Sequence, residues 1–155
     1  MTFCAIDFGT SNSALAVALP SGLVLTELEP GFSTMPTAVF YSADEATRHY
    51  GRAAVAAYVD GQHGRLMRSL KSILGSDLME ETTEIAAGRS VRYLDVVIGY
   101  LRRMREVAER QFGTTLQQLV LGRPVYFVDE DPLRDTRAQD TLAQAARAAG
   151  FATIE

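Results

Sequence analysis

The residues of this sequence that could do chemistry lie close to its start, in the segment DFGTSNS at positions 7–13. Gly9 has no Cβ, so the backbone at this position can approach a ligand closely. The side chains of residues 10–12 offer hydroxyl and amide groups beside successive backbone N–H groups, and such a turn can form a nest for an anion. Asp7 can hold a hydrated Mg²⁺ that bridges to phosphate oxygens, because Mg²⁺ keeps several waters and uses one or two carboxylates. The segment therefore indicates a phosphate-binding turn.

The same residue types also make ordinary hairpin turns, so this segment alone leaves a purely structural role open. Other phosphate-binding motifs are absent from the sequence, which has neither a GxxxxGK[ST] loop nor a GxGxxG after a strand. The letters D-F-G at positions 7–9 also occur in protein kinases, where a glycine-rich loop and a catalytic loop precede them. Only six residues precede Asp7, so that match is accidental.

Short apolar segments on both sides of this turn predict the strands that position it. Residues 2–8 and 14–19 are apolar runs of strand length, and the first is rich in β-branched and aromatic residues. The alternating pattern over 23–29 predicts a third strand, which completes an antiparallel meander. Residues 30–36 contain two prolines and a glycine, and we expect them to be irregular.

The rest of the chain alternates between helical and extended patterns. A helix with apolar residues at spacings of three and four is predicted from Leu94 to a C′ residue at Gly113. Another begins at Asp131, as N-cap, and Pro132. This order favours an α/β or α+β layer architecture. Further predicted elements are strands at 37–41, 116–122, 124–128 and 151–155, a helix at 51–58, a mixed segment at 61–76 and a weak strand or loop at 82–92.

Length and composition fit one globular unit. The chain has 155 residues, of which 47% are hydrophobic and 22% charged. Its net charge of −4 argues against a nucleic-acid or anionic-membrane partner, since both require a basic surface. One cysteine and two histidines cannot supply a disulfide or most metal sites. Without a signal peptide or an apolar run of about 20 residues, the expected location is cytoplasmic.

The segment AIDFGTSNS at 5–13, followed by two further strands, resembles the phosphate-1 segment of the actin-like ATPase superfamily, which includes actin, sugar kinases and heat shock protein 70. Four later segments resemble the heat shock protein 70 (DnaK-type) branch in the same order. Asn12 and the GRPV sequence depart from the chaperone pattern, and these departures resemble the DnaK-related YegD-type chaperones. The four segments are FSTMPTAVFY, HYGRAAV, SLKSILG and GRPVYF with the helix that follows it.

The resemblance implies an α/β fold, namely a ribonuclease H-like lobe with a mixed β-sheet flanked by helices and a smaller inserted α+β subdomain. Residues 1–38 and 114–155 would form the ribonuclease H-like core lobe. Residues 39–113 would form the inserted smaller lobe. In that superfamily the ATP site lies between two related lobes, so we expect this chain to be the N-terminal part of a longer ATP-binding and ATP-hydrolysing domain.

The resemblance also implies roles for single residues. Asp7 would organise the waters of Mg²⁺, and Lys71 would reach the γ-phosphate and the attacking water, which makes these two the catalytic candidates. Pro124 would couple the nucleotide state to interdomain movement. From spacing alone, Lys71 reads as a solvated surface lysine and Pro124 as a strand-edge proline. The residues that would line the β- and γ-phosphates are Gly9, Thr10, Ser11 and Asn12.

The implied cofactors are ATP or ADP with Mg²⁺, bound by the longer protein and weakly or not at all by this chain alone. The implied partners are the second lobe, unfolded client proteins and co-chaperones. We also expect an exposed apolar face and an unpaired last strand to favour a homodimer of this chain. Three other functions stay open: a small-molecule kinase of the sugar kinase type, an actin-like assembly protein and a non-catalytic binding module.

Three further features have simpler interpretations. The acidic run 129–131 could bind a metal, but an N-cap with carboxylates at a helix start explains it. Cys4 is expected to be a small core residue. The arginines at 102, 103, 105 and 110 could form a basic patch, but acidic residues lie between them, so a solvated helix face is the expected interpretation.

Overall fold

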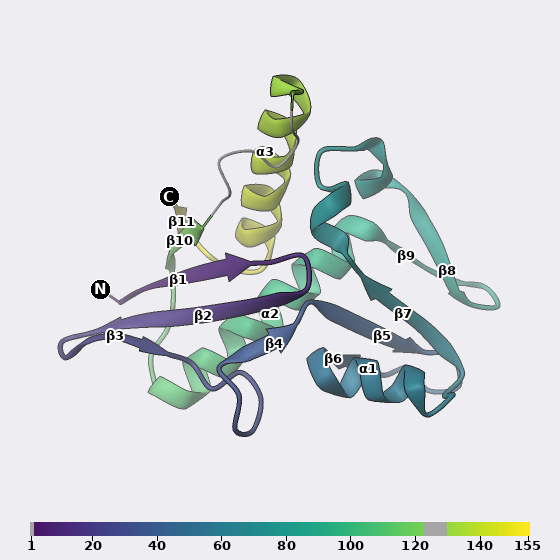
Figure 1. The fold of residues 1–155 in the computed structure, drawn as a ribbon, viewed down its shortest axis with the longest axis horizontal. Coiled ribbons are helices and arrows are strands. Elements are labelled where there is room, and N and C mark those ends of the chain that lie inside the picture. The colour runs from purple at the N-terminus through teal and green to yellow at the C-terminus, as the bar shows by residue number, and fades with distance from the viewer. Residues whose placement is uncertain (1, 123–129) are drawn as a thin grey trace.

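The computed structural model describes residues 2–122 and 130–155, and its main feature is a mixed β-sheet (Figure 1). In this part of the chain the sheet has six strands in the order β11-β10-β1-β2-β3, and β4 also pairs with β2. The bounds are β1 Phe3–Phe8, β2 Asn12–Leu19, β3 Gly22–Leu25, β4 Thr34–Pro36, β10 Gln118–Gly122 and β11 Thr153–Ile154.

Strand β1 lies in the interior of this sheet. It pairs antiparallel with β2 through a tight turn and parallel with β10, which arrives from a distant part of the chain. Asp7, at the end of β1, therefore lies between Ala14 of β2 and Gly122 of β10. The meander β1-β2-β3 predicted from the sequence is confirmed.

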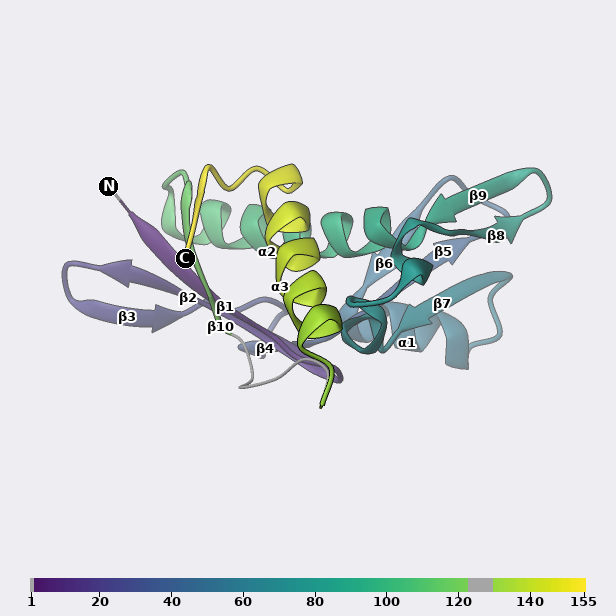
Figure 2. The same cartoon turned by 90° about the horizontal axis from the view of Figure 1, so that it is seen from above.

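Two long helices cover one face of the sheet. Helix α2 spans Tyr93–Phe112 and helix α3 spans Pro132–Ala148, and Figure 2 shows the two helices crossing. Their apolar side chains share one core cluster with alternate residues of β1 and β2. The fully buried residues that the two strands contribute are Cys4, Ile6, Phe8, Leu15 and Val17.

A second, smaller group of elements lies beside the sheet. Strands β5 (Ala38–Ser42), β6 (Arg48–Tyr50) and β7 (Gly64–Arg68) form a sheet in the order β6-β5-β7. Helix α1 (Gly51–Val59) packs its alanines against β5. The one-turn helices η1 (Leu70–Ile73) and η2 (Asp77–Glu80) follow β7, and then a hairpin of β8 (Thr82–Ala86) and β9 (Arg89–Arg92) leads into α2.

Several local predictions are confirmed. Gly113 ends α2 with a positive φ of 63°, a conformation that glycine adopts without steric cost. The side chain of Asp131 accepts a hydrogen bond of 3.1 Å from the backbone N–H of Arg134, so it is the N-cap of α3, and Pro132 occupies the first turn. The predicted mixed α/β class is also confirmed.

Other predictions are wrong. The third strand ends at Leu25 instead of 29. Residues 34–36 are not irregular, because they form β4 along the edge offered by the start of β2, where Pro36 lies opposite Asn12. A proline is compatible with a strand of this kind because edge positions need fewer N–H donors. The predicted strand at 124–128 lies outside the described residues.

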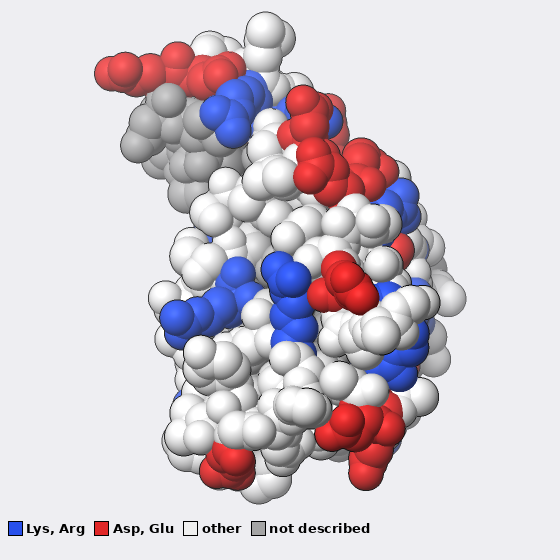
Figure 3. Space-filling model, turned by 90° about the vertical axis from the view of Figure 1, so that its right-hand side faces the viewer, with Lys and Arg blue, Asp and Glu red and all other residues white. Residues whose placement is uncertain are grey.

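The surface on the side of the β8–β9 hairpin carries charges of both signs. Lys and Arg side chains alternate there with Asp and Glu (Figure 3). Ion pairs join Arg92 to Glu80 and Asp95 at 3.0 and 3.2 Å, and Arg137 of α3 to Asp77 of η2 at 2.6 Å. None of the helices in the described part of the chain is both long and apolar enough to cross a membrane.

Candidate functional site

The carboxylate of Asp7 stands at the end of β1, on the face of the sheet that the helices leave open. Its neighbours Phe8 and Ile6 point into the core, whereas Asp7 is exposed. On the two flanking strands the residues opposite it are Ala14 and Gly122. Because one of these has a single methyl group and the other no side chain, the carboxylate is not crowded, and a hydrated cation has room beside it.

Glycine is required at position 9 by the tightness of the turn. A Cβ at Gly9 would lie 2.1 Å from the carbonyl oxygen of Asn12, well inside any permitted contact, and the obstructing atom belongs to the backbone. The turn therefore folds back onto Gly9 itself. The side chains of Thr10, Ser11 and Asn12 are exposed at its tip. The structure thus brings together the polar groups that the sequence predicted for an anion site.

Hydrogen bonds fix this turn to the segment between β4 and β5. The backbone N–H of Thr37 donates to the carbonyl oxygen of Ser11 at 2.9 Å. The hydroxyl groups of Ser13 and Thr37 lie 2.8 Å apart, and both residues are buried. One polar pair thus anchors the turn from the inside, while residues 10–12 stay accessible.

Tyr100 of α2 extends this anchor to the helix. Its hydroxyl donates to the carbonyl oxygens of Met35 and Pro36, each at 3.0 Å. Burial raises the pKa of Tyr100 to about 12, although hydrogen bonds with Ser13 and Thr37 oppose that rise. The phenol therefore stays protonated at neutral pH and remains a donor. These contacts, from Ser11 through Thr37 and its neighbour Pro36 to Tyr100, connect the turn to α2.

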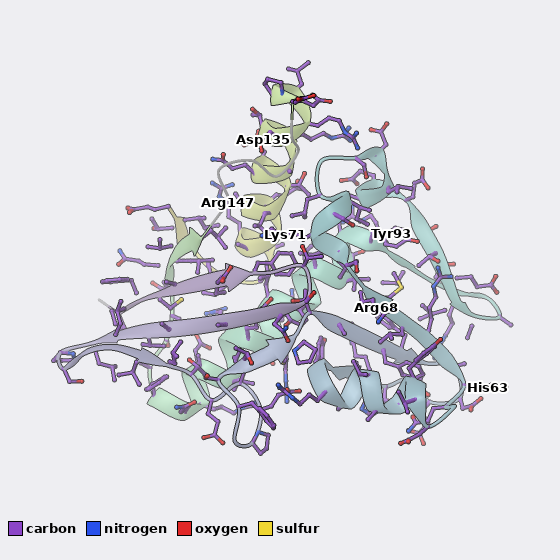
Figure 4. The ribbon with its side chains drawn as sticks, in the orientation of Figure 1. His63, Arg68, Lys71, Tyr93, Asp135 and Arg147 are labelled. Atoms are coloured by element: carbon purple, nitrogen blue, oxygen red, sulfur yellow. The ribbon has the colours of Figure 1, made fainter. Side chains whose placement is uncertain are left out.

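Lys71 lies on η1, which follows β7. Both ribbon views place this segment next to the β1–β2 turn, and Figure 4 shows Lys71 beside that turn. Leu70 and Leu74 are fully buried and anchor η1 in the core, whereas Lys71 is partly exposed. Ser69, just before η1, has a positive φ of 58°, which is uncommon for a residue other than glycine.

Lys71 is the only lysine in the 155 residues, and every other position counted among the Lys and Arg is an arginine. The two cations differ in chemistry. Arginine offers a planar fork with fixed donors, while lysine presents a compact charge on a flexible stem. A compact charge beside a phosphate-binding turn can follow a phosphoryl group as it moves. The use of lysine at position 71 alone is therefore consistent with a chemical role for this side chain.

Not every predicted site residue can be placed. Pro124 lies outside the described residues, and so does Asp129 of the acidic run. Within residues 2–122 and 130–155, no group of three or more His, Cys, Asp or Glu side chains could hold a metal ion by itself. A cation at Asp7 would therefore need water and phosphate oxygens as its other ligands, which is the coordination that Mg²⁺ favours.

Sequence reasoning missed Thr37 and Tyr100. One signal for Tyr100 was present, because a tyrosine within the apolar stripe of α2 is buried, and a buried phenol almost always has a hydrogen-bond partner. Its partners are 64 and 65 residues away in the sequence, so the signal could not identify them. Thr37 had no signal beyond its place before a predicted strand.

The chain is similar to several curated proteins, although no protein-family model matches it. A chaperone protein HscA homolog of Laribacter hongkongensis is 28% identical over 164 residues, which cover 94% of this chain and 25% of the relative. A chaperone protein HscA homolog of Azoarcus sp. (strain BH72) is 30% identical over 163 residues, covering 96% and 25%. Chaperone protein DnaK of Ureaplasma urealyticum serovar 10 is 27% identical over 124 residues, covering 80% and 19%. The chain spans a quarter or less of the length of these relatives.

Proposed function

We propose, from the support that these chaperone relatives give to the heat shock protein 70 family, that this chain is the N-terminal part of the ATP-binding and ATP-hydrolysing domain of a chaperone. The observation that carries the proposal is the closed turn after β1, with Asp7 at its root, exposed polar groups at its tip and the only lysine nearby. The YegD-type chaperones remain the branch that its departures resemble.

In this proposal each group has a separate task. Gly9, Thr10, Ser11 and Asn12 bind the β- and γ-phosphates through backbone N–H and side-chain donors. Asp7 holds water molecules of Mg²⁺, which when bound neutralises charge on the phosphate oxygens. The ammonium group of Lys71 stabilises the negative charge that develops on the γ-phosphoryl group during transfer to water. Pro124 is proposed to couple the nucleotide state to interdomain movement.

The division into lobes is also a proposal. Residues 1–38 and 114–155 would form the ribonuclease H-like core lobe, and 39–113 the inserted smaller lobe. The strand pairing supports it, because the six-stranded sheet draws its strands from residues 3–36 and 118–154, while the other two sheets lie within residues 38–92. In the whole protein the proposed partners are the second lobe, client proteins and co-chaperones, in the cytoplasm.

We further propose that this chain by itself forms a homodimer in concentrated solution. The face of the sheet that carries Asp7 also carries Phe3, Leu23, Leu25 and Val120, all of them exposed. Apolar patches of this kind usually become covered by another surface. ATP binding by this chain alone is expected to be weak or absent, because one turn supplies only part of a nucleotide site.

The single lysine makes a direct test available. Reductive methylation with ¹³C-formaldehyde labels only Lys71 and the α-amino group, and the NMR signal that is missing from a Lys71→Arg variant identifies the lysine. Adding Mg-tripolyphosphate or Mg-ATP at millimolar concentration should shift the Lys71 signal. Asp7→Asn should abolish that shift, and Asp60→Asn, an exposed carboxylate at the end of α1, should leave it unchanged.

A Lys71 signal that moves equally in the Asp7 variant would contradict the proposed site. In the complete protein, Lys71→Ala should abolish ATP hydrolysis and spare much of the ATP binding. Normal turnover in that variant would remove Lys71 from the mechanism and favour the small-molecule kinase instead, in which this lysine has no role.

A further inference from the structure

A groove lies between helix α2, strand β6 and the segment between β3 and β4. Two adjoining cavities of about 440 and 320 Å³ make up this groove, and both are lined by Arg48, Tyr50 and Arg103. Together they are in the size range of sites that hold organic ligands or peptide side chains, and larger than a single small anion requires. Neither cavity is lined by Asp7, Lys71 or the residues of the β1–β2 turn.

The groove is positively charged in a protein that is acidic overall. Four arginines line the two cavities, and two carboxylates, Glu29 and Glu106, lie among them, which gives 4 − 2 = +2. The whole chain has a net charge of −4. This local reversal of sign favours a negatively charged occupant. The four arginines are Arg48, Arg52, Arg102 and Arg103.

Two of these arginines are occupied by the fold. Arg52 forms an ion pair with Glu29, donates to the carbonyl oxygen of Thr34 at 2.8 Å, and lies 3.6 Å from the centre of the Phe32 ring. Arg102 donates to the carbonyl oxygen of Ala148 at 3.1 Å. The Arg52–Glu29 pair shows that one wall of the groove already binds a carboxylate supplied by the chain itself.

The other two arginines are oriented but not neutralised. Burial raises the pKa of Tyr41 and the nearby Arg48 guanidinium opposes that rise, while the guanidinium of Arg103 lies 5.9 Å from the centre of the Tyr50 ring. Neither forms an ion pair with a carboxylate of the described part of the chain. A guanidinium held by aromatic side chains keeps its planar fork available, and that fork matches the two oxygens of a carboxylate.

The groove also has apolar lining. Leu28 and Met35 are buried beneath it, and Phe32 is 46% exposed at its edge. An occupant that carries both carboxylates and an apolar side chain would meet matching chemistry on both counts. Glu29 and Glu106 interrupt the positive charge, so the evenly spaced phosphates of a nucleic acid would meet them, whereas a peptide can place its carboxylates opposite the arginines alone. A peptide is therefore favoured over a polynucleotide.

We propose that this groove binds an acidic peptide segment of a partner protein. Carboxylates of the peptide pair with Arg48 and Arg103, and an apolar side chain of the peptide packs on Phe32. This interaction surface is independent of the phosphate-binding turn, so its success or failure leaves the proposed nucleotide site untouched.

The test uses fluorescence anisotropy on the 155-residue chain. The probe is a fluorescein-labelled nonapeptide in which glutamate alternates with leucine and phenylalanine, and a matched peptide carries glutamine in place of glutamate. The acidic peptide should bind saturably, with a Kd below about 1 mM and at least about tenfold tighter than the glutamine peptide. Its affinity should fall as ionic strength rises, because part of the binding is electrostatic.

Matched variants locate the binding. The double variant Arg48→Gln/Arg103→Gln should weaken binding about tenfold, since each change removes one charge-assisted pair. The control Arg110→Gln/Arg134→Gln removes the same charge from exposed positions outside the groove and should change the affinity less than about twofold. Glu106→Gln should tighten binding by about two- to threefold, because it removes a like charge from the rim.

Equal binding of the two peptides would overturn the proposal, and so would an equal loss of affinity in the control variant. A single-stranded oligodeoxynucleotide that displaces the peptide at lower concentration would identify the groove as a nucleic-acid site instead. Circular dichroism checks the fold of each variant. If the double arginine variant does not fold, the Glu106→Gln result decides, since an unchanged or weaker affinity in that variant contradicts the proposed site.

Discussion

The two faces of the six-stranded sheet have similar composition and very different surroundings. On the face beneath α2 and α3, alternate residues of β1 and β2 such as Ile6 and Leu15 are at most 1% exposed. On the opposite face Phe3 is 43% and Leu25 is 56% exposed. A sheet with one solvated face normally alternates apolar with polar residues. Strands that are apolar on both faces are typical of a sheet that is covered on both, so the open face has the composition of an interior.

The largest difference between the two faces should appear in stability. Leu15→Ala leaves a cavity in a close-packed core and should lower the free energy of unfolding by about 2–5 kcal/mol. Leu25→Ala makes the same change on the open face and should cost less than about 0.5 kcal/mol. Urea denaturation followed by circular dichroism measures both values.

A similar loss of unfolding free energy for the two leucine variants would contradict the difference between the faces, because it would mean that the open face is packed in solution. Repeating the measurement at lower protein concentration then separates the causes. A cost at Leu25 that disappears on dilution comes from association, and one that persists comes from packing within a single chain.

A slightly smaller difference should appear at alkaline pH, where the covered face carries a titratable thiol. Burial raises the pKa of Cys4 from 9.0 to about 12. The unfolded chain therefore loses this proton before the folded chain does, so the stability contributed below about pH 9 declines as the pH rises towards 12. The loss should be on the order of 2–4 kcal/mol. Urea denaturation from pH 8 to 10.5 should show the start of this decline.

Cys4→Ala should make the loss of stability with rising pH smaller. A remaining loss is expected from Tyr100, whose pKa is also raised to about 12 by burial. Thiol reactivity gives an independent reading. The native chain should react with a disulfide reagent at pH 8 far more slowly than the urea-unfolded chain does. Rapid, complete reaction of the folded protein would show that the covered face is open to solvent.

The smallest effect concerns the proposed homodimer. The double variant Leu23→Ser/Leu25→Ser on the open face should weaken self-association by roughly tenfold, because it removes apolar area from the contact. Leu133→Ser is the matched control, since Leu133 is an exposed leucine on α3, away from the sheet. Sedimentation velocity at several concentrations measures the association. A wild-type chain that stays monomeric at high concentration would contradict the dimer.

Local signals predicted much of the fold. Gly113 and the pair Asp131-Pro132 mark helix ends through backbone chemistry that acts within a few residues, and the structure confirms both. Strands β4 and β6 were missed, because each has only three residues and exists through a pairing edge supplied by another segment. Such short segments have no periodicity of their own to detect.

The candidate site also has a part that local sequence signals predict and a part that depends on tertiary contacts. The residue types at Asp7 and Gly9 indicated phosphate chemistry, because both act through the turn in which they lie. The anchor formed by Thr37 and Tyr100 depends on tertiary contacts across dozens of residues, so it was not visible. The groove was hidden for the same reason, since Arg48 and Arg103 lie 103 − 48 = 55 residues apart. The arginines of α2 by themselves were interpreted as a solvated helix face.

The parallel pairing of β1 with β10 has a consequence for the synthesis of this protein on the ribosome. Phe3 pairs with Gln118, so one edge of β1 stays unpaired until 118 − 3 = 115 further residues have been synthesised. At about 5–20 residues per second, that delay lasts roughly 6–23 seconds. The hairpin of β1 and β2 forms within microseconds, so during this interval it exposes an unsatisfied apolar edge to the cell. An open edge of this kind can pair with another chain, so the nascent chain is exposed to aggregation until β10 has been synthesised.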